Sequence, residues 1–146
     1  MTGARPDTWM PFYVGDYLRD TGHLSPADVS AWLLACDAVA LPYRDGASLR
    51  RGSLMAALAH GCAVITTEPQ SAFPGLRDGE SARLVPAESA PALVLAVTGL
   101  LEAPELRARL GQGAAALAAQ FAWPAIAKQV KDFLVSLIGL DEQDRQ

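Results

Sequence analysis

The chain has 146 residues, of which 51% are hydrophobic and 19% are charged, and this composition indicates a folded globular protein rather than a disordered one. At this length a single domain can bury a core of its own. The net charge of -4 argues against broad attraction to nucleic acid or to an anionic membrane. Any site for an anion must therefore be local.

The N-terminal stretch "MTGARPDTWMPFYVG" lacks the apolar segment of a signal peptide, and no run approaches the roughly 18 apolar residues that cross a bilayer. Cys36 and Cys62 lie in apolar surroundings without metal-ligand spacing, which favours buried, reduced thiols. His23 and His60 each stand alone. We therefore expect a cytoplasmic protein with no membrane span, no metal site and no cofactor.

The first regular element is a helix of about Pro26 to Cys36. Ser25 is suited to cap its start, Pro26 fits the first helical position, and Asp28 adds an acid to the first turn. The face expected to pack on the core carries Val29, Trp32, Leu33 and Cys36.

Two short apolar runs, Ala38–Tyr43 and Cys62–Thr67, are predicted as strands that are buried on both faces. A helix of about Ser53 to His60 lies between them, and Gly61 is placed to end it in a left-handed conformation. This order predicts a βαβ unit with parallel strands and a ligand site at their carboxyl ends.

The loop "EPQSAFPGLRDGE" leads to a third predicted strand over Ser81–Pro86. Helices are expected over Ala90–Leu101, Pro104 to about Gln120, and Pro124 to about Ile138. Their apolar stripes predict core packing, through Leu106, Leu110 and Leu117 on one helix and Ile126, Val130, Phe133, Leu134 and Leu137 on the next. The fold class is thus α/β, a partial Rossmann-like parallel sheet of about three strands flanked by helices, with a helical C-terminal region.

The loop "YRDGASLRRGS" before the short second helix is the candidate site. A helix start exposes unpaired N–H groups and a partial positive charge, and two adjacent arginines would strengthen its attraction for an anion. Arginine suits phosphate because its planar fork can donate two parallel hydrogen bonds. The residues expected to bind a phosphate or diphosphate are Gly46, Ser48, Arg50, Arg51, Gly52 and Ser53.

The alternative is that Arg44, Arg50 and Arg51 form a solvated cluster on the surface. The loop matches neither the GxGxxG nor the GxxxxGK[ST] pattern, so its sequence alone does not distinguish a phosphate site from a solvated surface cluster. Its position after a strand and before a helix favours the ligand site.

From about Leu24 to Leu134 the chain resembles the donor-binding half of retaining glycosyltransferases that are built from two Rossmann-like domains. The likeness runs in order through "ACDAVALPY", "SLRRGSLMAALAHGCAVITT", "LRDGESARLVP", "LLEAPELRARLG" and "FAWPAIAKQ". The resemblance implies that the chain binds a nucleoside-diphosphate sugar, with the leaving diphosphate stabilised by the helix start and by basic side chains.

The sequence departs from this family at three places. The resemblance places Ser48 and Ala56 where most members carry a pair of glutamates, and Gly75 where they carry another glutamate. We assign no catalytic residue. Because the resemblance covers only the donor half, we expect sugar transfer only together with an acceptor domain or chain, and no turnover by this chain alone.

The segment "WMPFYVGDYLRDTGHLS", Trp9 to Ser25, instead resembles the start of a family of small bacterial and phage-associated proteins of unknown function. We therefore expect three parts: residues 1–24 of different origin, a partial donor-binding domain over 25–138, and a polar tail over 139–146. The apolar side chains of the first part either dock on the domain or bind a partner.

The competing hypothesis for function is a truncated, non-catalytic remnant or protein-interaction module. An incomplete parallel sheet would expose edges and apolar helix faces, and these would favour self-association.

Overall fold

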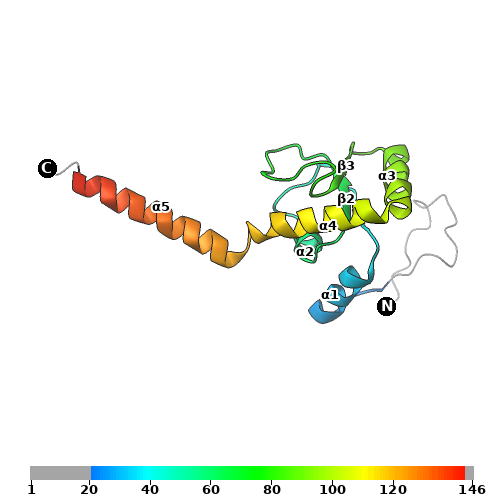
Figure 1. Ribbon diagram of the computed structural model, residues 1–146, viewed down its shortest axis with the longest axis horizontal. Helices are drawn as coiled ribbons and strands as arrows, with labels where there is room; N and C mark the ends of the chain where they lie inside the picture. The colour runs from blue at the N-terminus through cyan, green and yellow to red at the C-terminus, as the bar shows by residue number, and fades with distance from the viewer. Residues whose placement is uncertain (1–20, 144–146) are drawn as a thin grey trace, which may run out of the picture.

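The computed structural model of the protein describes residues 21–143. Within these residues, three strands and five helices follow one another (Figure 1). They are α1 (Pro26–Ala35), β1 (Val39–Leu41), α2 (Gly52–Ala59), β2 (Val64–Thr67), β3 (Arg83–Val85), α3 (Ala90–Glu102), α4 (Pro104–Ala119) and α5 (Trp123–Gln143). The predicted α/β class is confirmed, and every predicted helix and strand is present.

The three strands form one parallel sheet in the order β1-β2-β3. Val39 pairs with Val64, and Ile65 pairs with Arg83, so β2 is the central strand. All four residues of β2 are buried, as predicted. β1 was expected to be buried on both faces, but it is an edge strand and its residues are only half-buried or exposed. The prediction for β1 is wrong because the cover of the sheet is incomplete at this edge: Ala40, which pairs with the buried Ile65, is exposed.

Helices cover both faces of the sheet. One core cluster joins Val64 of β2 to Leu54 and Leu58 of α2, and the other joins Ile65 to Leu100 of α3. Because successive side chains of a strand point to opposite faces, α2 and α3 lie on opposite sides of β2. Helix α4 contributes to both clusters and lies beside α2 in Figure 1. Its predicted stripe is confirmed, with Leu110 and Leu117 buried and Leu106 half-buried.

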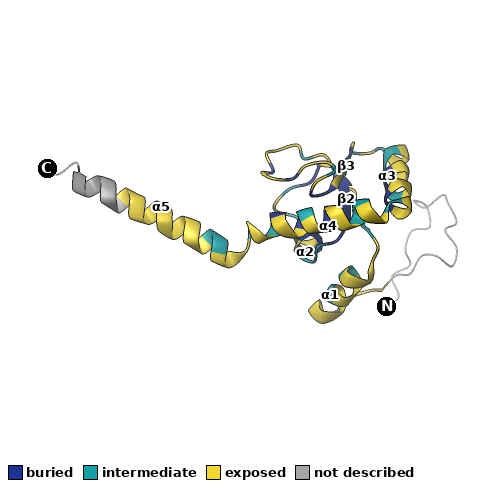
Figure 2. Ribbon diagram, in the orientation of Figure 1, coloured by how far each residue is buried: buried dark blue, intermediate teal, exposed yellow. Residues whose placement is uncertain are grey.

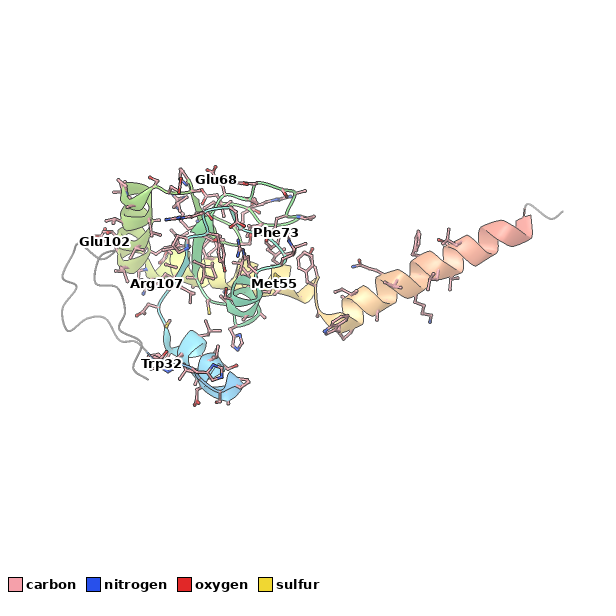
Figure 3. All side chains as sticks on the ribbon, turned by 180° about the vertical axis from the view of Figure 1, so that it is seen from behind. Trp32, Met55, Glu68, Phe73, Glu102 and Arg107 are labelled. Carbon is pink, nitrogen blue, oxygen red and sulfur yellow. The ribbon has the colours of Figure 1, made fainter. Side chains whose placement is uncertain are left out.

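The connection from β2 to β3 has no helix and is fixed by a few anchors. Phe73 and Leu76 are buried in the core, and the Phe73 ring meets that of Phe121 edge-on at a centroid distance of 6.1 Å. Phe73 is labelled in Figure 3. The buried Ser81 hydroxyl donates to the Gly75 carbonyl and accepts from the Arg77 amide. These contacts let parallel strands join through an irregular loop.

Side chains and backbone at the helix ends explain the boundaries. Ser25 accepts a hydrogen bond from the Asp28 amide at 3.2 Å and so caps α1, as predicted. Gly61 ends α2 at φ 65°, also as predicted. Arg107 donates to the carbonyl oxygens of Leu100 and Leu101 at 2.6 and 2.8 Å, which neutralises the negative end of α3.

The expected core face of α1 is largely wrong. Leu33 is half-buried against the core, whereas Val29, Trp32 and Cys36 are exposed. Besides Leu33, the Ser30 hydroxyl contacts the domain and lies 2.8 Å from His60 Nε2. The predicted burial of both thiols therefore holds for Cys62 alone.

Helix α5 differs most from expectation. It continues to Gln143, past the predicted end, and it projects away from the rest of the molecule (Figures 1 and 2). Its stripe was predicted to pack in the core, but Val130, Phe133, Leu134 and Leu137 are exposed and Ile126 is half-buried. The periodicity of the sequence identified the apolar face of α5 correctly, but the expectation that this face packs in the core of the domain was wrong. Among the described residues, no helix has both the length and the hydropathy needed to cross a membrane.

Gly46 offers a test of the loop geometry. It has φ 77°, and a Cβ atom there would lie 2.5 Å from the Glu68 carbonyl oxygen. Gly79 has a similar φ of 73° but nothing within 4 Å of the same position. Both alanine variants carry the left-handed strain of about 1–2 kcal/mol, and only Gly46→Ala adds a clash with the backbone.

Chemical denaturation should thus show Gly46→Ala to be clearly less stable than Gly79→Ala. Equal free energies of unfolding for the two variants would contradict the close approach of the loop to β2.

Candidate functional site

The candidate site lies at the carboxyl end of β1, in the loop of residues 42–51 that leads into α2. The loop is fastened to the end of β2 by two hydrogen bonds. The Ala47 amide donates to the Thr67 carbonyl at 3.3 Å, and the Thr67 hydroxyl donates to the Tyr43 carbonyl at 2.8 Å. Gly46 and Ala47 are buried between loop and sheet. The start of α2 is therefore held in a fixed place at the carboxyl edge.

The start of α2 has no side-chain cap. Arg51 is the N-cap residue and makes no side-chain capping bond, whereas Ser25 and Ser89 cap α1 and α3. The Met55 amide makes a helix-type bond at this end, to the Arg51 carbonyl at 3.0 Å. Gly52 and Ser53, one turn earlier, are exposed. Their N–H groups and the positive end of the helix dipole are thus available to an anion from outside.

The Arg51 side chain is positioned by two neighbours, Tyr43 and Asp45. Its guanidinium carbon lies 4.7 Å from the centroid of the Tyr43 ring, and its Nη2 forms an ion pair with Asp45 Oδ1. The Tyr43 hydroxyl lies 2.7 Å from the Ser53 hydroxyl, which joins the ring to the first turn of α2. The guanidinium is half-buried and belongs to the N-cap residue of α2. Stacking and ion pairing leave it less freedom than an exposed arginine has.

The other predicted residues are distributed differently around this start. Gly46 supports the loop from beneath, and Ser48 is half-buried, its carbonyl accepting from the Arg51 amide at 3.1 Å. Arg50 is exposed. Arg44 turns to Glu88, 3.8 Å away, with 90% of its side chain exposed, so it does not join Arg51.

Tyr43 and Asp45 were missed as site residues from the sequence. Tyr43 closes an apolar run and was assigned to the strand, while Asp45 was assigned to a turn. The turn itself brings them to Arg51, since the Gly46 amide donates back to the Tyr43 carbonyl at 3.4 Å. One signal in the sequence could have indicated this cluster. The turn sequence "YRDG" contains the aspartate, and an arginine follows that aspartate by six residues.

A cavity of about 350 Å³ opens at the same edge of the sheet. It is lined by the ends of all three strands and the start of α3, through Pro42, Arg44, Thr67, Val85, Pro86, Glu88, Ser89, Ala90 and Leu93. Glu88 has φ 58°, and among the described residues it is the one non-glycine residue with positive φ. Such strained positions concentrate at functional sites. The cavity therefore lies at the same edge of the sheet as the start of α2, and both polar and apolar side chains line it.

The structure also describes the positions at which the resemblance implies a glutamate in most family members. Ala56 is half-buried on α2, and Gly75 adopts φ 84°, where a Cβ atom would lie 2.6 Å from Leu117 Cδ1. A larger residue at position 75 would displace Leu117. Within the described residues, no group of three or more histidine, cysteine, aspartate or glutamate side chains could hold a metal ion.

Comparison with known proteins identifies the class. The family model for glycosyl transferases group 1 matches residues 5–103, and the chain belongs to this family. The match includes most of residues 1–24, a segment that lies almost wholly outside the described residues, and its separate origin stays a prediction.

Three relatives support the assignment. Phosphatidyl-myo-inositol mannosyltransferase of Mycolicibacterium smegmatis is 28% identical over 114 residues, covering 78% of this chain and 29% of the relative. Anabaena HepE, solved in complex with UDP, superposes with TM-score 0.65 at 23% identity, covering 75% of this chain and 30% of HepE. Sucrose-phosphate synthase from Thermosynechococcus elongatus gives TM-score 0.65 at 25% identity, with coverages of 82% and 30%.

These likenesses confirm the Rossmann-like fold and the resemblance to glycosyltransferases. The chain spans about 30% of the length of each relative.

The two thiols should differ in reactivity. Burial, with a smaller contribution from the nearby Cys36, raises the pKa of the Cys62 thiol, and its Sγ donates to the Leu33 carbonyl at 3.4 Å. Cys36 is exposed. Because alkylation requires the thiolate, iodoacetamide at neutral pH should label Cys36 first and Cys62 after unfolding, as read by mass spectrometry. Equal rates in the folded protein would contradict the burial of Cys62.

Proposed function

We propose that this chain forms the donor-binding wall of a group 1 glycosyltransferase and holds a nucleoside-diphosphate sugar by its diphosphate at the start of α2. The open, uncapped helix start beside a stacked arginine is the observation that carries the proposal. Family membership supports it, and so does the presence of UDP in the HepE structure.

The diphosphate would be bound in two ways. The amides of Gly52 and Ser53 point out of the first turn of α2 and would donate to one phosphate. Arg51 would donate to the other from its place above Tyr43, and Arg50 would add charge from the exposed side. The exposed Ser53 hydroxyl, linked to Tyr43, would be a further donor.

The same contacts would also stabilise the leaving diphosphate during sugar transfer. In sugar transfer from a nucleoside-diphosphate sugar, the bond between the anomeric carbon and the diphosphate oxygen breaks, and negative charge develops on that oxygen. Fixed amides and guanidinium groups stabilise such charge without reorganising. The nucleoside and sugar would extend along the carboxyl edge toward the cavity lined by Thr67 and Glu88.

Transfer itself needs an acceptor site. We propose that this site belongs to another domain or a companion chain, and that the present chain supplies one wall of the cleft. No described carboxylate occupies the place of the family's paired glutamates, since Ser48 and Ala56 stand there. The proposal therefore predicts donor binding by this chain and assigns no catalytic residue.

Titration calorimetry with UDP, and with inorganic pyrophosphate as a probe for the phosphates alone, tests the site. Arg50→Ala/Arg51→Ala should weaken UDP binding by about tenfold or more, because a hydrogen bond to a charged group contributes roughly 1.5–3 kcal/mol. Arg77→Ala/Arg109→Ala removes the same charge from two exposed arginines and should bind as the wild type does. Equal affinity of wild type and the Arg50/Arg51 variant would rule out the site.

The ion pair between Asp45 and Arg51 leads to a second prediction, in which a substitution strengthens ligand binding instead of weakening it. The Asp45 carboxylate holds one edge of the Arg51 guanidinium and repels an incoming anion. Asp45→Asn should therefore tighten pyrophosphate binding by about 1.4- to 5-fold, the range that corresponds to roughly 0.2–1 kcal/mol for an exposed ion pair. Weaker binding in this variant would show that Asp45 orients Arg51 more than it competes with the ligand.

A further inference from the structure

Both cysteines of the chain lie at the amino edge of the sheet, opposite to the proposed donor site. Cys36 comes three residues before Val39 of β1, and Cys62 comes two residues before Val64 of β2. Val39 and Val64 are register partners, and the Val39 amide donates to the Ala63 carbonyl at 3.0 Å. Because neighbouring strands lie about 4.7–4.9 Å apart, the segments that carry the two cysteines enter the sheet side by side.

The Cys62 sulfur reaches the end of α1, where Cys36 is located. Cys62 Sγ donates to the Leu33 carbonyl at 3.4 Å. Cys36 is the C-cap residue of α1, three residues after Leu33, and residues at this spacing are neighbours on a helix. Burial raises the pKa of the Cys62 thiol, and the charge of the nearby Cys36 adds to the rise. Each sulfur therefore lies within range of the charge of the other.

The two thiols differ in their access to solvent. Cys36 is exposed, whereas Cys62 is only 6% exposed. A reagent in solution can therefore react with Cys36 directly, while Cys62 lies behind it. An accessible cysteine beside a second, resolving cysteine is the arrangement that forms a disulfide by way of a mixed intermediate.

Helix α1 is held to the domain by few contacts, so its end can shift while the core stays folded. The helix has no buried residue, and Figure 2 shows it exposed over most of its length. Its half-buried side chains, Ser30 and Leu33, contact His60 and the core cluster around α2. A disulfide requires α-carbons about 4.4–6.8 Å apart, and a small shift of the last turn of α1 would bring Cys36 and Cys62 together.

We propose that Cys36 is a site of thiol modification by small-molecule disulfides such as oxidised glutathione, and that Cys62 resolves the adduct into an intramolecular disulfide. The bond joins the end of α1 to the segment that leads into β2. It fixes the amino end of the edge strand β1, while the Ala47 amide and the Thr67 hydroxyl tie the loop after β1 to the other end of β2. The proposal does not depend on the donor site, which lies at the carboxyl edge.

The exchange proceeds in two steps. The Cys36 thiolate attacks one sulfur of oxidised glutathione, so that a bond to Cys36 Sγ forms, the S–S bond of the reagent breaks and one glutathione thiolate leaves. Cys62 then loses its proton to solvent and attacks Cys36 Sγ, which breaks the mixed disulfide and releases the second glutathione. The two protein thiols give up two electrons and two protons, and the reagent is reduced to two thiols.

Mass spectrometry of the full chain after incubation with oxidised glutathione tests the pair. The wild type should lose two hydrogen atoms and retain no glutathione. Trypsin cleaves after Arg44, Arg50 and Arg51, between the two cysteines, so a linked peptide identifies the bond. Cys62→Ala should retain one glutathione on Cys36, whereas Cys36→Ser should stay unmodified while it is folded.

Three results would overturn the proposal: a wild type that does not react, a wild type that retains glutathione as Cys62→Ala does, or a wild type that links to a second copy instead. Reaction of Cys36→Ser at the rate of the wild type would also overturn it. Circular dichroism before oxidation checks that the two variants are folded.

Thermal unfolding of the wild type supplies a measurement that needs no variant at the buried position. Oxidation should raise the Tm by about 5 °C or more, because the bond closes the loop between residues 36 and 62 in the unfolded chain. Dithiothreitol should restore the original Tm, and Cys36→Ser treated in the same way should show no change. A Tm that oxidation leaves unaltered or lowers would contradict a bond that joins α1 to the folded domain.

Discussion

The close approach of the loop of residues 42–51 to the end of β2 is the constraint on which the site depends. Gly46 lies so near the Glu68 carbonyl that no side chain fits, and Thr67 ties the loop to the sheet from the other direction. This contact sets the point at which α2 begins. Because the helix start carries the unpaired amides, the backbone of the fold itself defines where an anion can bind.

The proposed site would reconcile an acidic chain with an anionic ligand. The net charge of -4 gives no long-range attraction, so binding must come from local donors at fixed positions. Arg51 is stacked on Tyr43 and paired with Asp45, which keeps the guanidinium at the helix start and offsets part of its charge. If the proposed site holds a diphosphate, its selectivity over other anions would follow from this geometry more than from charge.

The sequence predicted those features that depend on neighbours along the chain. Ser25, Pro26 and Gly61 marked helix ends correctly because capping is local, and β2 was recognised by its β-branched residues. The βαβ order then placed the glycine and arginine loop at the carboxyl edge. Arg51, Gly52 and Ser53 were located at the helix start for the same reason.

The failures share a different cause. The stripes of α1 and α5 predicted apolar faces but could not say what covers them, and Trp32 and Phe133 are exposed. Tyr43 and Asp45 reach Arg51 only through the turn at Gly46, a contact across the loop that no periodicity encodes. The cavity beside Glu88 was also missed, because it is lined by the ends of three strands that are distant from one another in the sequence.

Amide chemical shifts of the labelled protein, followed by NMR during titration with UDP, test the central claim most directly. We expect the largest changes at Gly52, Ser53 and Leu54, with smaller ones along the carboxyl edge at Thr67 and Glu88. Changes confined to other surfaces, or a spectrum that UDP leaves unaltered, would contradict a diphosphate site at the start of α2.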